Sequence, residues 1–367
     1  MFSVYRFYRF HSQIPQIPLS LYYFNNTLKF RKIGNEKNSW CRGTKVGNHI
    51  KFLHVAKYTT VAASEASNQS PRRIIAVGDL HGDYEQTLKV LKMTRILDAK
   101  ENWIGNNGIL VQTGDIVDRG PDCLKIYKLF DRLRQEASKV GGQVINLIGN
   151  HEIMNLVLSW SYVTPGDISS FGTAQNRVHE FSSEGYIGNL LLTTFQIASI
   201  VENDTLFVHG GIDIEWAKKG IENINILGKE LVNKTTKMLS RENPTITWNA
   251  MNVTKEEASI FLDVNGPLWM RKYAEKEDEY IKKMLDEVLE ILKVKRMVIG
   301  HTPLSNRILS KYNGKVYVID VGISSYYGGN LAALEIVGDQ VKEIYPDGMF
   351  KLQNFKIMHR LSIEKLN

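Results

Sequence analysis

The chain has 367 residues, 43% of them hydrophobic, which is enough for one large core or two small ones. Its two cysteines, Cys41 and Cys123, are too few for a disulfide framework, and their spacing excludes a metal site built from thiolate pairs. Of the net charge of +7, residues 1–70 carry +8, from ten Lys and Arg against two acids, so the rest of the chain sums to −1 and we expect no nucleic acid partner.

Residues 1–71 are predicted to be a targeting segment that ends in a linker. This arm has no acidic residue before Glu36 and mixes Arg with aromatic and hydroxyl residues, which is typical of a transit peptide, most simply a mitochondrial one. The alternatives for this segment are a secretory signal or a disordered basic arm. The alternatives for the location of the protein are another organelle or the cytoplasm. Its longest apolar stretch, residues 14–24, contains Gln16 and two prolines, and we expect no transmembrane segment.

From Arg72 onward, short apolar runs alternate with helical patterns. Helical spacing predicts helices over residues 84–97 and 123–137 and a long charged helix over residues 273–292. Six runs end in Gly, Asp, Asn or His and predict buried strands: RRIIAVGD, NGILVQTGD, QVINLIGN, DTLFVHGG, KRMVIGH and KVYVIDVG. The pattern indicates an α/β catalytic domain over residues 72–348, followed by a basic tail over residues 349–367.

Residues able to bind metal ions or transfer protons follow these strands, at the end of an open α/β sheet where ligands bind. A lone GD or a single histidine there is commonly structural, but four of the nine histidines of the chain recur at such positions. Oxygen and imidazole ligands without thiolates suit Mn, Fe or Zn. The candidates are Asp79 and His81 in GDLHG, Asp115, Asp118 and Arg119 in GDIVDRG, Asn150, His151 and Glu152 in GNHE, His209 in HGG, and His301 in GHT.

In this order, the five motifs resemble those of the phosphoprotein phosphatase branch of the calcineurin-like metallophosphoesterases. The resemblance covers residues 72–336 and implies two mixed β-sheets packed as a sandwich and flanked by helices. It also implies two divalent or trivalent metal ions, the first held by Asp79, His81 and Asp115, and the second by Asp115, Asn150, His209 and His301. In the same way, His151 supported by Asp118 looks like the general acid, and Arg119 looks like a phosphate clamp.

Further segments resemble the Shewanella-like phosphatases within this branch. They are the insert at residues 155–172 after GNHE, GPLWMRKY at residues 266–273 and DVGIS within residues 320–336. In this group Arg271 looks like a second phosphate clamp, the alternative being an arginine that caps surface structure. At residues 190–192, where the group implies an arginine, the chain has leucines.

The leading functional prediction is a metal-dependent phosphatase that hydrolyses phosphate monoesters, with a phosphorylated protein as substrate, by attack of a hydroxide that bridges the two metals. Phosphotyrosine and phosphoserine or phosphothreonine both stay open. Tyr326 and Tyr327 either flank a pocket deep enough for a phenyl ring or are packing residues. One alternative is hydrolysis of a diadenosine tetraphosphate or polyphosphate, which predicts more basic residues in the groove. A non-catalytic phosphate-binding scaffold would need a damaged metal set.

Overall fold

The computed structural model describes residues 70–275, 278–304 and 307–351. All of them lie in one of the two units into which the chain divides, residues 68–367. Nearly all of the predicted targeting arm and of the predicted C-terminal tail lies outside the described residues.

The first sheet has seven strands in the order β12-β11-β10-β1-β2-β3-β4. Its parallel half contains β1 (Ile74–Val77), β2 (Ile109–Gln112), β3 (Gln143–Leu147) and β4 (Phe195–Gln196). The antiparallel half contains β10 (Ala333–Val337), β11 (Gln340–Tyr345) and β12 (Gly348–Lys351). β1 joins the two halves, because it pairs in parallel with β2 and antiparallel with β10.

The second sheet has five strands in the order β5-β6-β7-β9-β8. β6 (Thr205–Val208), β7 (Arg296–Ile299) and β9 (Val316–Val318) are parallel, and β5 (Ala198–Val201) and β8 (Leu309–Lys311) are antiparallel edges. Both sheets are therefore mixed, which confirms the predicted fold class. All six predicted strands are present, as β1, β2, β3, β6, β7 and β9, and the central ones are buried on both faces.

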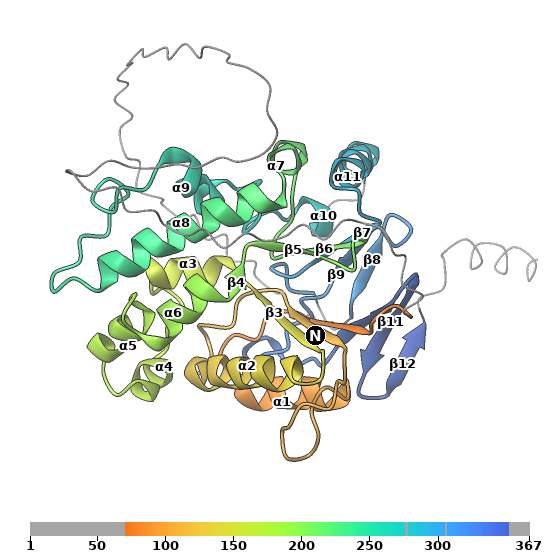
Figure 1. Ribbon diagram of the computed structural model, residues 1–367, viewed down its shortest axis with the longest axis horizontal. Helices are drawn as coiled ribbons and strands as arrows, with labels where there is room; N and C mark the ends of the chain where they lie inside the picture. Colours follow the sequence, from red (N-terminus) through yellow and green to blue (C-terminus); the bar gives the residue numbers. More distant parts are fainter. Residues whose placement is uncertain (1–69, 276–277, 305–306, 352–367) are drawn as a thin grey trace, which may run out of the picture. The chain divides into compact units, whose positions relative to one another are not determined.

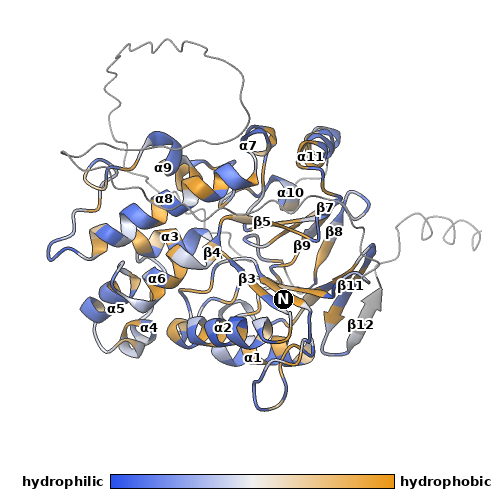
Figure 2. Cartoon of the chain, viewed as in Figure 1, coloured by the Kyte–Doolittle hydropathy of each residue, from blue (hydrophilic) through white to orange (hydrophobic). Residues whose placement is uncertain are grey.

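Helices flank the two sheets (Figure 1). Beside the seven-stranded sheet lie α1 (Tyr84–Met93) and α2 (Cys123–Ser138), and beside the five-stranded sheet lie α7 (Ile214–Lys219), α10 (Lys272–Glu275) and α11 (Glu279–Leu292). The remaining α-helices gather at one end of the sheets: α3 (Asn150–Leu156), α4 (Pro165–Ser170), α5 (Ala174–Phe181), α6 (Tyr186–Thr193), α8 (Ile221–Leu239) and α9 (Lys255–Leu262). Most helices are two-sided, with hydrophobic residues toward the interior (Figure 2).

Two predicted helices differ from the observed ones in their bounds. In each case a polar side chain hydrogen-bonds to the backbone at the point where the helix begins or ends. The helix predicted over residues 84–97 ends at Met93, where the Thr94 hydroxyl donates to the Leu91 carbonyl. The prediction of a single helix over residues 273–292 was wrong, because this stretch contains two helices. Asp278 caps the start of α11, its side chain accepting from the Ile281 amide, so α10 and α11 are separate. Among the described residues, no helix is both long and apolar enough to cross a membrane.

Candidate dinuclear metal site

The predicted site residues meet where parallel strands of the two sheets end. Loops after β1, β2 and β3 come from one sheet, and loops after β6 and β7 come from the other. The side chains of the candidate metal ligands, and those of Asp118 and His151, are 0–4% exposed, and the two arginines are half-buried. Five residues in these loops have a positive φ, between 43° and 71°: His81, Asp115, Asp118, Arg119 and His301. Such backbone conformations are unfavourable for residues with a side chain and cluster at functional sites, because the surrounding fold must enforce them.

Two buried clusters of possible metal ligands share one carboxylate. His81, Asp115 and His151 form the first, and Asp115, His209 and His301 form the second; the donor atoms of each cluster lie within 4.8 Å of one another. Asp115 belongs to both, as a ligand that bridges two ions must. Its Oδ2 lies 3.3 Å from His209 Nε2 and 3.9 Å from His81 Nε2.

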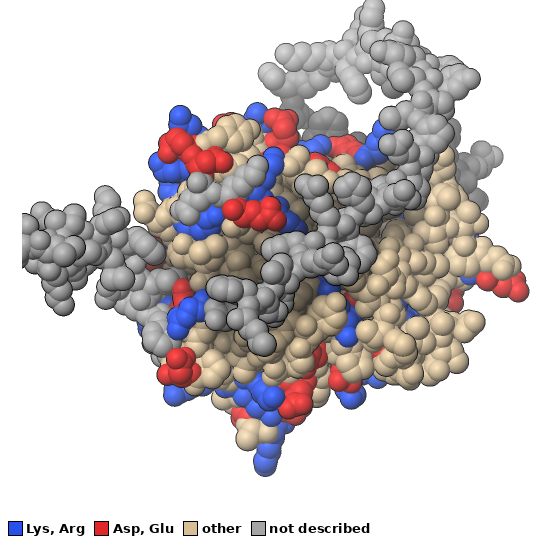
Figure 3. Space-filling view, turned by 180° about the vertical axis from the view of Figure 1, so that it is seen from behind, with Lys and Arg blue, Asp and Glu red and all other residues tan. Residues whose placement is uncertain are grey.

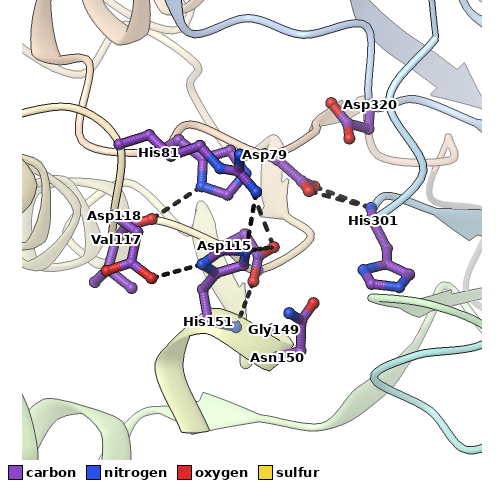
Figure 4. A network of polar contacts seen from close by, with 12 residues as sticks. Asp79, His81, Asp115, Val117, Asp118, Gly149, Asn150, His151, His301 and Asp320 are labelled. Carbon is purple, nitrogen blue, oxygen red and sulfur yellow. Dashed lines mark hydrogen bonds and ion pairs between the residues drawn. The ribbon is translucent and has the colours of Figure 1, made fainter. Parts of the chain in front are cut away.

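The two remaining predicted ligands, Asp79 and Asn150, contact residues of the second cluster. Both carboxylate oxygens of Asp79 accept from the backbone amide of His301 at 3.2 Å (Figure 4), and Asp79 is in neither cluster. His151, predicted as an acid, is in the first cluster instead. Asn150 Oδ1 lies 2.9 Å from His209 Nε2, so the amide is beside the second cluster, where it was predicted to bind.

Glu152 holds the two loops that carry Asp115 and Asn150. Its carboxylate is fully buried and accepts from the backbone amides of Asp115, Ile116 and Gly149 at 2.7–2.9 Å. Three charge-assisted hydrogen bonds to one side chain tie the end of β2 to the start of α3. The position of Asp115 therefore depends on a residue that belongs to neither cluster.

The acidic side chains of the site are closed off from water and close to one another. Burial raises the pKa of Asp79, and the charges of Asp320 and Asp115 raise it further. Burial also raises the pKa of Asp320 to about 6. For Asp115, burial alone raises the pKa, but the charges of His209 and His151 outweigh it and hold the pKa well below its usual range. Crowded buried carboxylates of this kind fit a site that binds cations.

Two of the candidate imidazole ligands show a complementary pattern. Burial, with the charge of His151, lowers the pKa of His81 to about 3, and burial, with the charge of His209, lowers that of His301 well below its usual value. A neutral imidazole is the form that binds a metal ion. The Nε2 atom of His301 is buried and has no hydrogen-bond partner in the described part of the chain. The donor set therefore fits the two ions implied by the motifs.

His151 and Asp118 form a buried pair beside the clusters. The Nδ1 atom of His151 lies 2.6 Å from Asp118 Oδ2 (Figure 4). The Asn155 amide donates to Asp118 Oδ1 at 3.0 Å. The carboxylate fixes the ring orientation and leaves Nε2 directed toward Arg119, whose Nη2 lies 3.4 Å away. This is the geometry required of a general acid and its orienting carboxylate.

Both predicted arginines line a cavity of about 180 Å³ together with four of the metal-ligand candidates, His81, Asp115, Asn150 and His301. The guanidinium of Arg119 lies 4.6–5.0 Å from the ring centres of Tyr162, Tyr326 and Tyr327. Arg271 donates to the carbonyl of His301 at 2.9 Å. Arg271 thus lines the same cavity as Arg119.

Some residues of the site had no role in the sequence prediction. Asp320 is 1% exposed, lines the same cavity and follows β9, so its place at the end of the apolar stretch in KVYVIDVG was the signal that could have identified it. Tyr162 comes from the 155–172 insert, and its carbonyl accepts from the Arg119 amide at 2.9 Å. Arg177, on α5, is fully buried behind Asp118. No arginine lies at residues 190–192, which belong to α6.

Comparison with known proteins places this geometry in a family. Residues 72–305 match the family model described as calcineurin-like phosphoesterase. An uncharacterised protein of Schizosaccharomyces pombe is 37% identical over 74% of this chain and 79% of its own length. The Shewanella-like protein phosphatase 1 of Plasmodium berghei is 32% identical, over 69% of this chain and 68% of its own.

A solved structure agrees with these matches. The cold-active protein-tyrosine phosphatase of a psychrophilic Shewanella species is 27% identical, covers 77% of this chain and 81% of its own, and superposes with a TM-score of 0.65. The chain belongs to the calcineurin-like phosphoesterase family. Its relatives include Shewanella-like protein phosphatases, as the motifs predicted, and the protein is a hydrolase that acts on phosphate esters.

Proposed function

We propose that this protein is a dinuclear-metal-dependent phosphatase that removes phosphate from proteins, with phosphotyrosine as the preferred residue. The observation that carries the proposal is one cavity that receives members of both ligand clusters, which share Asp115, and that is also lined by Arg119 and Arg271. An enzyme for phosphate monoesters needs these functions in one place: a nucleophile, charge to bind the phosphoryl oxygens, and an acid for the leaving group.

The metal ions would be held by the residues that the family motifs assign. These are Asp79, His81 and Asp115 for one ion, and Asp115, Asn150, His209 and His301 for the other, with Mn, Fe or Zn as the metals that suit the donors. When bound, such a pair of ions supplies a nucleophilic water at neutral pH and positive charge for the phosphoryl oxygens.

The protein's own side chains account for binding and protonation. Arg119 and Arg271 bring two permanent positive charges to the cavity, and a guanidinium fork matches the oxygens of a phosphate. His151 donates a proton to the departing oxygen of the substrate, and Asp118 keeps the ring in the orientation for that transfer. Acid catalysis of this type contributes roughly 10²–10⁴-fold.

The tyrosines around Arg119 support an aromatic substrate. Tyr162 and Tyr326 are 43% and 64% exposed, so their rings extend from the phosphate clamp to the surface. A phenyl ring attached to a bound phosphate would lie against these aromatic faces, which favours a phosphotyrosine over the shorter phosphoserine. The Shewanella protein of similar structure is itself described as a tyrosine phosphatase.

The alternatives are less well supported by the cavity. A diadenosine tetraphosphate or polyphosphate chain carries several charges, and Arg119 and Arg271 are the only Lys or Arg side chains among the described residues that line the site. On the face seen in Figure 3, basic and acidic side chains are interspersed. A non-catalytic scaffold is disfavoured because every predicted ligand position keeps a residue able to bind metal.

The substrate proposal is tested with the full-length protein in the presence of Mn²⁺. We expect the highest kcat/KM on a phosphotyrosine peptide, with a phosphoserine peptide, diadenosine tetraphosphate and polyphosphate at least about ten-fold lower. The Asp115→Asn variant should lose roughly 10³-fold or more in kcat, because Asp115 is the ligand that both clusters share. Equal turnover by this variant would refute the mechanism, and faster turnover of a phosphoanhydride would refute the substrate.

We also propose that residues 1–71 direct the protein to mitochondria. The support is the acid-poor, Arg-bearing composition of this arm, whose +8 charge contrasts with the −1 of the remaining chain.

A further inference from the structure

A buried arginine lies directly behind the Asp118–His151 pair. The side chain of Arg177 is 0% exposed, and its Nε donates to Asp167 Oδ2 at 2.7 Å. Its Nη2 atom lies 3.8 Å from Asp118 Oδ1, the oxygen that also accepts from Asn155. The carboxylate that orients His151 therefore has a cation on its far side.

The surroundings of Arg177 leave it no access to water. Its guanidinium lies 4.9–5.6 Å from the ring centres of Trp160, Phe171 and Phe181. In the described part of the chain, neither Nη atom makes a hydrogen bond. A buried charge of this kind is strongly unfavourable unless it is paired.

Asp167 alone does not account for this arrangement. One of its oxygens accepts from Arg177 Nε, and the other accepts from the Cys123 thiol at 2.7 Å. The Nη side of the guanidinium is turned instead toward Asp118. A methionine or leucine would fill the same aromatic pocket without the cost of burying a charge, so simple packing does not explain an arginine at this position.

We propose that Arg177 is a positioning residue for proton donation, which holds Asp118 and through it the His151 ring in the orientation needed to protonate the leaving group. The proposal rests on the proposed role of His151 as the acid. It also gives the 155–172 insert a role in the site, because Asp167 and Trp160 of this insert contact Arg177 and hold it in place.

Dependence on the leaving group separates this role from a structural one. Protonation matters most when the departing oxygen is strongly basic, as in an alkyl phosphate, and hardly at all for a nitrophenyl phosphate. A misplaced acid therefore slows poor leaving groups selectively. A variant that only loosens the fold slows every substrate by a similar factor.

The experiment uses the full-length Mn²⁺-loaded protein and a series from nitrophenyl phosphate through phenyl phosphate to an alkyl phosphate. The test variant is the double substitution Arg177→Met with Asp167→Asn, which removes both charges and leaves neither unpaired. The matched control is Arg296→Met. Arg296 is also buried, at 5% exposed, and pairs with Asp204, but it begins β7 at the end opposite His301.

We expect kcat of the double variant to fall roughly 10- to 100-fold on the alkyl phosphate and less than about two-fold on nitrophenyl phosphate, with KM unchanged. Arg296→Met should change all substrates alike. Arg177→Lys is a second test if the double variant does not fold. It keeps a cation beside Asp167, but a lysine lacks the fork that faces both carboxylates, so the same selective loss is expected.

His151→Asn provides the reference, because it removes the acid itself. If His151→Asn steepens the leaving-group dependence and the Arg177 variants do not, the positioning role is refuted while the proposed function stands. If His151→Asn leaves the dependence unchanged, the proposed acid is wrong, and the inference about Arg177 is overturned with it.

Discussion

Asp320 shows at the scale of a single residue how burial at this site couples stability to pH. It follows a strand of the five-stranded sheet, yet its carboxyl group lies close enough to Asp79 to raise that group's pKa. Its own pKa is raised by burial from 3.8 to about 6. A carboxyl group with a raised pKa stabilises the fold below its unfolded pKa, and that contribution is lost as the pH rises through the folded pKa.

The metal-free protein should therefore lose stability between about pH 4 and pH 6, and Asp320→Asn should lessen this loss by about 3 kcal/mol. The variant is neutral at every pH, and its remaining Oδ1 can still accept from the Gly322 amide. Urea unfolding in EDTA across this pH range measures the effect, with Asp347→Asn on an exposed turn as control. Parallel curves for the wild type and Asp320→Asn would contradict it.

Single residues also mark what sequence patterns reveal. His81, Asp115 and His301 were predictable because each follows an apolar run that ends in a characteristic motif. Arg177 was not, because AQNRVHEF resembles an ordinary half-exposed helix and nothing in its periodicity indicates burial. Its partner Asp118 is 59 positions away, so only packing brings the two side chains together.

At the scale of elements, helix α3 begins inside the site. Gly149 is its N-cap, and the first residues of the helix are Asn150 and His151, whose backbone amide donates to Asp115 Oδ1 at 3.0 Å. A Cβ atom at position 149 would lie 2.1 Å from the same oxygen. The close approach of β2 and α3 therefore requires glycine here.

Gly149→Ala should displace Asp115 and lower kcat roughly 100-fold, while the circular dichroism spectrum stays that of a folded protein. Gly166→Ala in α4 is the matched control, because the added Cβ would meet only Pro121 at 3.2 Å and Thr164 at 3.9 Å. Steady-state kinetics on nitrophenyl phosphate compare the two. Normal activity in Gly149→Ala would show that the loop can shift without moving the ligand.

Strands were easier to predict than helix ends and antiparallel edges. The six runs found in the sequence are central strands, whose continuous apolar composition results from burial on both faces. The antiparallel strands β5, β8 and β11 lack this signature, because an edge or outer strand buries fewer of its residues. The break between α10 and α11 depends on a single cap at Asp278, which the helical periodicity of residues 273–292 obscured.

At the scale of the whole molecule, the predicted arm and the catalytic residues occupy separate stretches of chain. The site residues run from Asp79 to Asp320, and the strands that carry them begin at Ile74. Removing residues 1–69 should therefore leave kcat/KM for a phosphotyrosine peptide within about two-fold of the full-length value. Separately, residues 1–70 fused to a fluorescent protein should direct that protein to mitochondria.

The two measurements are independent, namely kinetics of the purified truncated protein and microscopy of the fusion. A fusion of residues 1–70 with its Lys and Arg replaced by Gln is the control for targeting by charge. A large loss of activity on truncation would show that the arm contributes to catalysis, and a diffuse cytosolic fusion would refute the targeting role.

The sequence by itself determined the family, the sheet strands that form the core and the residues that gather at their ends. It could do so because parallel strands deliver the residues that follow them to one edge, so local patterns suffice. Only the tertiary structure decided how those side chains contact one another. Asp79 accepts a hydrogen bond from the His301 amide, and the rings of three tyrosines surround the Arg119 guanidinium. Arg177 lies beside Asp118, on the side away from His151. These contacts join residues distant in the chain, and their geometry follows from packing between elements, which leaves no periodic trace in the sequence.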